Sequence, residues 1–201
     1  EFKEIGAGIQ LGPNVFRMFE LLGLTKEMFH WAAFPESLEL RDSITAETVI
    51  ELRIDKLYDR YQAPYGVIHR ADMLNVIFDA CKNSNLIKLV TSQKVVALEQ
   101  DGSGVTARTE SGETFKGAAL IGCDGLWSTV REKIVGDGKP NVSGHIAYRA
   151  VLPTADWPKE YRLPKMVIWC GEKTHLVHYP LRRGELFNLV AVFPQARQVN
   201  A

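Results

Sequence analysis

His175 and Tyr179 are the residues whose types and spacing best suit chemistry on an aromatic ring. They lie in the segment 174–181, whose sequence Thr-His-Leu-Val-His-Tyr-Pro-Leu favours a strand. Residues two apart share a face of a strand, so both side chains point the same way, about 13 Å apart at ~3.3 Å per residue. They could bracket one ring, with histidine as a base for a phenol near neutral pH. From the pattern alone, the commoner role for both is that of ordinary amphipathic sheet residues.

A second motif, at residues 118–128, suits nucleotide binding. An apolar run over 118–122 leads into Gly122-Cys123-Asp124-Gly125, and Ser128 can cap a helix that follows. A buried strand, a tight turn and a helix place backbone N–H groups and a carboxylate at the carboxyl end of the strand, where nucleotides bind in α/β sheets. The pattern predicts a parallel strand over 118–122. The alternative role for Asp124 is that of a turn or helix-capping residue.

Two further segments could face an anion or a close neighbour. Arg70 begins a predicted helix, where the macrodipole disfavours a cation, so it either serves an anion such as phosphate or pairs with Asp72. The glycines at 6–12 have one residue too many for a dinucleotide fingerprint, and no apolar strand precedes them. We therefore expect a glycine loop that lets the backbone approach a ligand or another strand.

Periodicity predicts a mixed α/β (α+β) chain. We expect helices over 12–23, 70–82 and 128–135, a hairpin within 34–54, a β-meander within 88–116, and antiparallel strands near 144–152, 165–170, 174–181 and 186–193. The helix over 70–82 is expected to bury one stripe, Leu74, Ile77, Phe78 and Cys81. Arg182 and Arg183 are expected in a solvated turn, and the tryptophans 127, 157 and 169 in a core or interface.

Composition excludes several classes of function. The 24 basic and 24 acidic residues cancel, which argues against nucleic acid as a partner. No apolar run reaches the roughly 20 residues that span a bilayer, and the start lacks a signal peptide. The three cysteines are far apart, which favours reduced thiols and a cytoplasmic protein, and no His/Cys spacing indicates a metal. The unusual ends indicate a segment of a longer protein.

The order of the motifs resembles the single-component FAD-dependent aromatic hydroxylases, over nearly the whole chain. The matching segments are Gly6-Ala7-Gly8-Ile9 with Pro13-Asn14, His69-Arg70-Ala71-Asp72, Gly122 to Arg131, Ser143 to Arg149 and Thr174 to Leu181. This resemblance implies part of a Rossmann-like FAD-binding domain with a β-meander, at 1–33 and 65–140. Interleaved with it is part of an antiparallel substrate domain, at 34–64 and 141–201. The family's GxGxxG unit and Gly-Asp segment are not among these residues.

The resemblance also implies an activity. FAD would be the cofactor, NADH or NADPH and O₂ the co-substrates, and a small aromatic acid the substrate, with 3-hydroxybenzoate converted to gentisate. His175 would deprotonate the phenol and Tyr179 would orient it, whereas the FAD contacts would be Arg70, Val96, Asp124, Gly125, Gly8 and Ile9. The expected assembly, if the protein has one, is a homodimer. The alternatives are salicylate hydroxylation to catechol with loss of CO₂, a truncated flavin-free binding module, and a nicotinamide dehydrogenase, which would need a GxGxxG loop directly after a strand.

Overall fold

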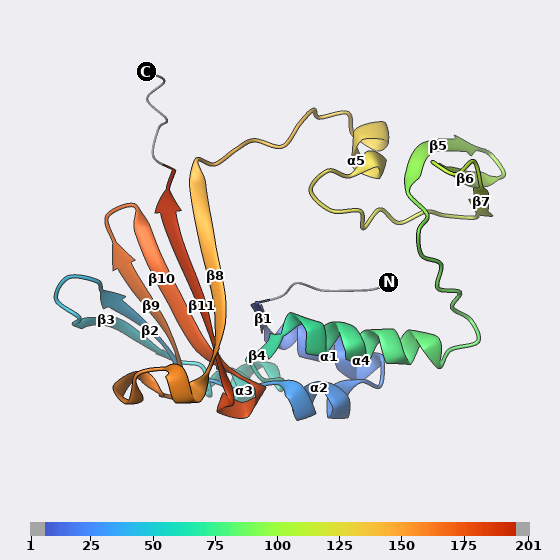
Figure 1. Cartoon of the computed structure of the whole chain (residues 1–201). Helices are drawn as coiled ribbons and strands as arrows, with labels where there is room; N and C mark the ends of the chain where they lie inside the picture. Colours follow the sequence, from blue (N-terminus) through green and yellow to red (C-terminus); the bar gives the residue numbers. More distant parts are fainter. Residues whose placement is uncertain (1–6, 196–201) are drawn as a thin grey trace, which may run out of the picture. The chain divides into compact units, whose positions relative to one another are not determined.

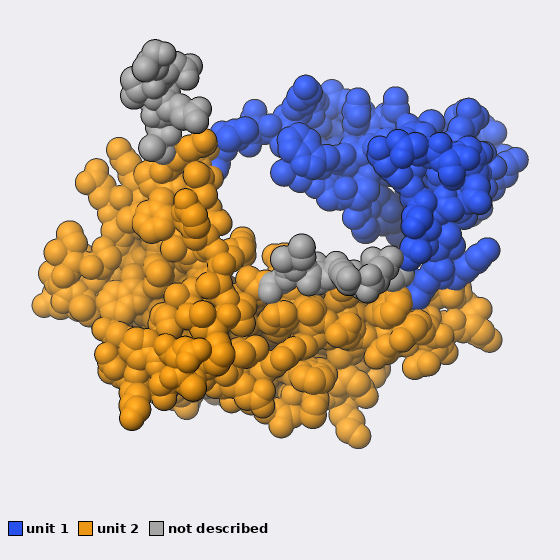
Figure 2. Space-filling view, in the orientation of Figure 1, with its two compact units in different colours: residues 1, 88–143 blue, residues 2–87, 144–201 orange. Residues whose placement is uncertain are grey.

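The computed structural model describes residues 7–195, which fall into two compact units. Figure 2 colours these units separately: unit 1 comprises residues 88–143, and unit 2 comprises the described residues up to 87 and from 144 onward. The units divide the chain at other positions than the predicted domains, because the hairpin and the first helices stay with the late strands. The assignment of a cofactor domain and a substrate domain stays a prediction.

Unit 2 is built on a six-stranded sheet (Figure 1) with the strand order β3-β2-β9-β10-β11-β8. Its strands are β2 (Ser37–Asp42), β3 (Thr48–Arg53), β8 (His145–Pro153), β9 (Lys165–Gly171), β10 (Thr174–Leu181) and β11 (Leu186–Pro194). All neighbours are antiparallel except β2 and β9, which run parallel. The predicted hairpin and the four predicted late strands are confirmed. Short 3₁₀ turns at Thr154–Asp156, Lys159–Tyr161 and Arg182–Gly184 connect them.

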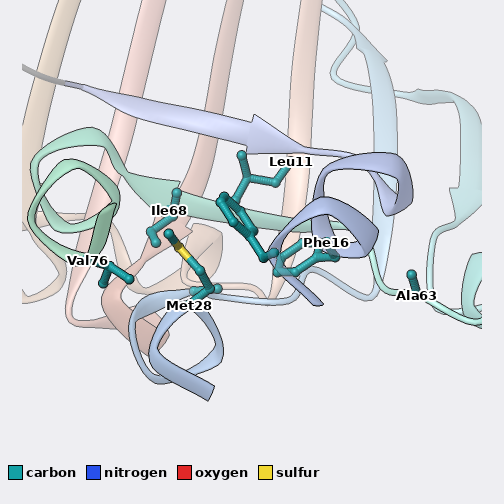
Figure 3. Close-up of a cluster of buried hydrophobic side chains, with 8 residues drawn as sticks. Leu11, Phe16, Met28, Ala63, Ile68 and Val76 are labelled. Carbon is teal, nitrogen blue, oxygen red and sulfur yellow. The ribbon is translucent and has the colours of Figure 1, made fainter. Parts of the chain in front are cut away.

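The first part of unit 2 packs helices on a two-stranded ribbon. The ribbon pairs β1 (Gly8–Leu11) with β4 (Gly66–His69), and the helices are α1 (Pro13–Leu21), α2 (Thr25–Trp31), α3 (Leu57–Tyr61) and α4 (Arg70–Lys82). Figure 3 shows part of the buried apolar cluster between them, with Leu11, Phe16, Met28 and Ile68 close together. The predicted helix over 12–23 is confirmed, because Pro13 opens α1 and Phe16 lies on its buried face.

Helix α4 forms where it was predicted, but the stripe predicted for it is only partly confirmed, since Ile77 packs against the buried apolar cluster. The residues it buries are Asp72 and Val76, whereas Leu74, Phe78 and Cys81 are only half-buried. Hydrophobicity alone did not indicate that a charged residue, Asp72, belongs to the buried face of this helix. Asp72 is buried through an ion pair with Arg182, which is distant in sequence.

The two faces of the large sheet carry different side chains near the middle of β10. On one face Tyr179 joins a second buried cluster with Ala33, Val67 and Met166. On the other face His178 is enclosed by aromatic rings, with centroids 5.1 to 6.5 Å away; these belong to Trp157, Tyr161, Trp169 and Phe187. The prediction that Trp157 and Trp169 belong to a core is therefore confirmed.

Unit 1 contains a three-stranded antiparallel meander and one short helix. The elements are β5 (Val95–Asp101), β6 (Gly104–Thr109), β7 (Thr114–Gly117) and α5 (Thr129–Ile134). The meander and the helix were predicted, although β5 starts later than residue 88. The predicted strand over 118–122 is wrong, since these residues form no strand and are mostly exposed. A parallel strand needs a parallel neighbour, and no strand described in unit 1 pairs with them. Trp127, predicted in a core or interface, is 76% exposed.

Candidate functional site

His175 and Tyr179 lie on one face of β10, as the alternation predicted. Each pairs across the sheet with β11: His175 with Val192, and Tyr179 with Asn188. Tyr179 is buried, whereas His175 is exposed at the far end of the strand. They line two separate hollows that share Val177: that of His175 has about 530 Å³ and that of Tyr179 about 340 Å³.

The hollow beside Tyr179 combines a phenol, a cation and apolar walls. It is lined by Tyr179 and Val177 of β10, Val190 of β11, Arg149 of β8, and Gly8, Ile9 and Gln10 of β1. Arg149 faces this hollow because it pairs with Val190, which pairs with Val177. Burial raises the pKa of Tyr179 to about 12, although the positive charges of Arg149 and Arg70 oppose the shift. The phenol therefore stays protonated at neutral pH and can donate a hydrogen bond.

Gly8 brings the backbone of β1 against the Tyr179 ring. A Cβ atom at Gly8 would lie 2.6 Å from Cε2 and 2.7 Å from the hydroxyl of Tyr179. The Gly8 N–H also donates to Oδ1 of Asn188, the residue paired with Tyr179 across the sheet, at 2.7 Å. The prediction of a glycine that admits a close approach to another strand is confirmed here. Gly6, which opens the glycine run, lies outside the described residues, and Gly8 and Ile9 belong to a strand rather than a loop.

Arg70 is the first residue of α4, and His69 caps the helix by accepting the N–H of Ala71 on Nδ1 at 3.2 Å. Asp72 does not serve as the partner of Arg70 that the sequence allowed for. Both of its carboxylate oxygens instead accept hydrogen bonds from Arg182, each at 2.7 Å. The expectation of a solvated turn is therefore wrong for Arg182, which is half-buried in an ion pair, whereas Arg183 is exposed as expected. The chain reverses after β10 directly against α4 and α2, where Arg183 donates to the backbone oxygen of His30 at 3.0 Å.

The candidate residues in unit 1 surround the start of α5. The Asp124 carboxylate accepts a hydrogen bond from the Ser128 hydroxyl and another from the N–H of Val130 at 3.2 Å. The bond from Ser128, and then that from Val130, keep the pKa of Asp124 below its ordinary value although burial opposes this. Gly125 has a φ of 80°, which favours glycine. Asp124 thus supports the helix start, and the roles of Asp124, Gly125 and Val96 toward a cofactor stay predictions.

The described residues contain neither a cluster of metal ligands nor a membrane-spanning helix. Within 7–195, no three His, Cys, Asp or Glu side chains gather as metal ligands would. No helix in that range has the length and apolar character needed to cross a membrane. Cys81, Cys123 and Cys170 are free thiols, as the spacing predicted.

Comparison with known proteins identifies the family. The chain matches the FAD binding domain family over residues 7–199, and it belongs to that family. It is 40% identical over 191 residues to 3-hydroxybenzoate 6-hydroxylase 1 of Aquipseudomonas alcaligenes, covering 94% of this chain and 48% of the relative. It is 39% identical over 199 residues to 3-hydroxybenzoate 6-hydroxylase of Klebsiella oxytoca, covering 98% of this chain and 50% of the relative. The chain thus spans about half the length of these relatives.

Solved structures share the fold at lower identity. Klebsiella pneumoniae HpxO complexed with FAD and uric acid superposes with a TM-score of 0.82 at 20% identity, over 99% of this chain and 50% of that one. A salicylate hydroxylase substrate complex gives 0.72 at 21% identity, over 96% and 49%. The predicted family of FAD-dependent aromatic hydroxylases and the α/β (α+β) fold are confirmed.

Proposed function

We propose that the protein carrying this chain is an FAD-dependent monooxygenase that hydroxylates a monohydroxybenzoate. The reaction would use NADH or NADPH and O₂, and it would convert 3-hydroxybenzoate to gentisate. The observation that carries this proposal is the hollow beside β10, where the protonated phenol of Tyr179, the cation of Arg149 and two valines meet. This combination is complementary to an aromatic ring with an anionic substituent. The names of the two relatives at 39–40% identity support the same substrate class.

The residues of unit 2 also suit FAD. Helix α4 begins with Arg70, and the first-turn carboxylate of Asp72 is neutralised by Arg182, so the positive end of the helix can face a phosphate. Gly8 and Ile9 line the hollow with little side-chain bulk at Gly8. We assign Arg70, Gly8 and Ile9 as FAD contacts in unit 2, and Asp124, Gly125 and Val96 in unit 1. Bound FAD would supply the activation of oxygen.

The chain's own residues would bind the substrate and move its proton. Arg149 would pair with the carboxylate, and the Tyr179 hydroxyl would donate a hydrogen bond that orients the ring. His175 lines the neighbouring hollow, and across the shared Val177 it would accept the phenolic proton, which makes the ring more electron-rich. Its exposure lets it return that proton to water.

Product analysis with a substrate panel tests this proposal. The purified protein is supplied with FAD, NADH and each monohydroxybenzoate in turn, and the products are separated chromatographically. We expect gentisate from 3-hydroxybenzoate. Catechol from salicylate would establish the decarboxylating alternative instead, and a protein that neither binds flavin nor oxidises NADH would favour the binding module.

A histidine variant tests the proposed base. His175→Gln should lower the hydroxylation rate near pH 7 by about 10²-fold, since a general base contributes roughly that much or more. Glu172→Gln, in the exposed turn before β10, is the matched control and should keep the wild-type rate. An unchanged rate in His175→Gln would remove His175 from the mechanism.

A further inference from the structure

An ion pair joins the helix that begins with Arg70 to the strand that carries Tyr179. Asp72 is 4% exposed, and Nε and Nη2 of Arg182 each donate to one of its oxygens at 2.7 Å. The guanidinium also lies 5.8 Å from the ring centre of Trp31 on α2. A bidentate pair of this kind fixes orientation as well as distance.

Asp72 and Arg182 lie close in sequence to the two proposed binding residues, Arg70 and Tyr179. Asp72 is the third residue of α4, two residues after Arg70, and Arg182 directly follows β10, three residues after Tyr179. The positive charge of Arg70 already acts on Tyr179, since it opposes the rise of that group's pKa. The ion pair therefore links the helix that begins with a proposed cofactor contact, Arg70, to the segment that follows a proposed substrate contact, Tyr179.

The backbone at this turn shows that the arginines are held in place. Arg182 and Arg183 have φ values of 46° and 57°, in the left-handed region that residues other than glycine rarely adopt. Such conformations persist where surrounding contacts determine them. Arg182 is held by Asp72, and Arg183 by the backbone oxygen and the Nδ1 of His30, at 3.0 and 2.9 Å.

We propose that the Asp72–Arg182 ion pair is a positioning device that fixes Arg70 relative to Tyr179, and so sets cofactor and substrate in register. Neither residue needs to touch the substrate. The pair also cancels the carboxylate at the start of α4, which would otherwise repel a phosphate. This inference rests on the proposed function, because it assigns Arg70 to FAD and Tyr179 to the substrate.

The test compares Asp72→Asn with Asp79→Asn in the whole protein. Asp79 lies on the same helix in an exposed pair with Lys82 at 2.7 Å, so it is a matched control. The readouts are the FAD dissociation constant and the coupling ratio, the product formed per NADH oxidised. The coupling ratio does not depend on how much of the enzyme is folded, so a merely structural role would leave it unchanged. We expect Asp72→Asn to weaken FAD binding and lower coupling, each about tenfold, because small misplacements are costly in catalysis.

Two further variants keep the inference falsifiable. Asp72→Glu should recover part of the coupling because it restores the charge. Asp72→Asn/Arg182→Gln leaves no unpaired buried charge, so it should recover thermal stability but not coupling. Wild-type coupling and FAD affinity in Asp72→Asn, or full recovery of both in the double variant, would overturn the inference.

The failure of the proposed function gives a different result. If the wild-type protein binds FAD but hydroxylates no hydroxybenzoate, the proposed function falls and the FAD dissociation constant of Asp72→Asn still decides the inference. If the wild-type protein binds no FAD, both fall together.

Discussion

Replacing Gly8 with alanine would put a methyl group into the ring of Tyr179. The new Cβ would lie 2.6, 2.7 and 3.0 Å from the Cε2, hydroxyl and Cζ atoms, all closer than packed atoms tolerate. Neither side can move away easily: the Gly8 N–H is tied to Asn188 at 2.7 Å, and Tyr179 is 3% exposed in the middle of a sheet. Overpacking of this kind costs about 1–3 kcal/mol. At about 2–4 °C per kcal/mol, we expect the melting temperature to fall by roughly 2–12 °C.

A double-mutant cycle locates this cost at Tyr179. Urea unfolding is measured for the wild type, Gly8→Ala, Tyr179→Leu and the double variant. Leucine has no atoms where Cε2 and the hydroxyl lie, so the cost of Gly8→Ala should fall by at least about 1 kcal/mol in that background. Gly102→Ala is the control, since a Cβ there meets nothing within 4 Å.

Two results would contradict this account. If Gly8→Ala melted with the wild type, the close contact between β1 and Tyr179 would be wrong. If its cost were the same with leucine at 179, the strain would lie elsewhere. In either case the hollow beside β10 would not have the shape on which the proposed substrate site depends.

The remaining predictions concern His178 and Ser128. Burial lowers the pKa of His178 from 6.5 to about 4, so the unfolded chain takes up a proton between these values and the folded chain does not. The free energy of unfolding should therefore fall by up to about 3 kcal/mol as the pH drops from 6.5 to 4. Urea unfolding at a series of pH values should show a smaller fall in His178→Phe, and an equal pH dependence in the two proteins would contradict this. Ser128→Ala removes the oxygen that accepts the Arg131 N–H at 3.0 Å, so α5 should lose about 1 kcal/mol. Hydrogen exchange over 129–134 should speed up, and unchanged protection would refute the role of the cap.

The local elements of this fold could be predicted because their signals are local. Short alternating or apolar runs bounded by turns mark the strands of the large sheet. Pro13 is the first residue of α1, and Ser128 directly precedes α5 as its cap. The strand predicted at 118–122 failed for the opposite reason. An apolar run becomes a parallel strand only beside a parallel partner, and no described strand of unit 1 provides one.

The charges of the site could not be predicted, because their partners are distant in sequence. Asp72 is a buried carboxylate whose partner, Arg182, lies 110 residues away. The buried Glu39 pairs with the nearby Arg41 and also with Lys165, 126 residues away. The periodicity of the sequence shows that a charge interrupts an apolar face, but it does not identify the partner of that charge. Arg149 was missed although alternation on β8 places it on the same face as Val190 and Val177, since only the strand order brings β8 to this hollow.

The contrast between Tyr179 and His175 suits the two tasks proposed for them. Tyr179 is fixed by residues from three separate segments: Gly8 contacts its ring, Asn188 pairs with it across the sheet, and Arg182 anchors the end of its strand. A group that orients a ring must itself be held, because small displacements are costly. His175 is exposed at the other end of the same face, where a base can exchange its proton with water. One strand can thus hold a rigid donor and a solvent-accessible acceptor on the same face, provided that its two ends differ in burial.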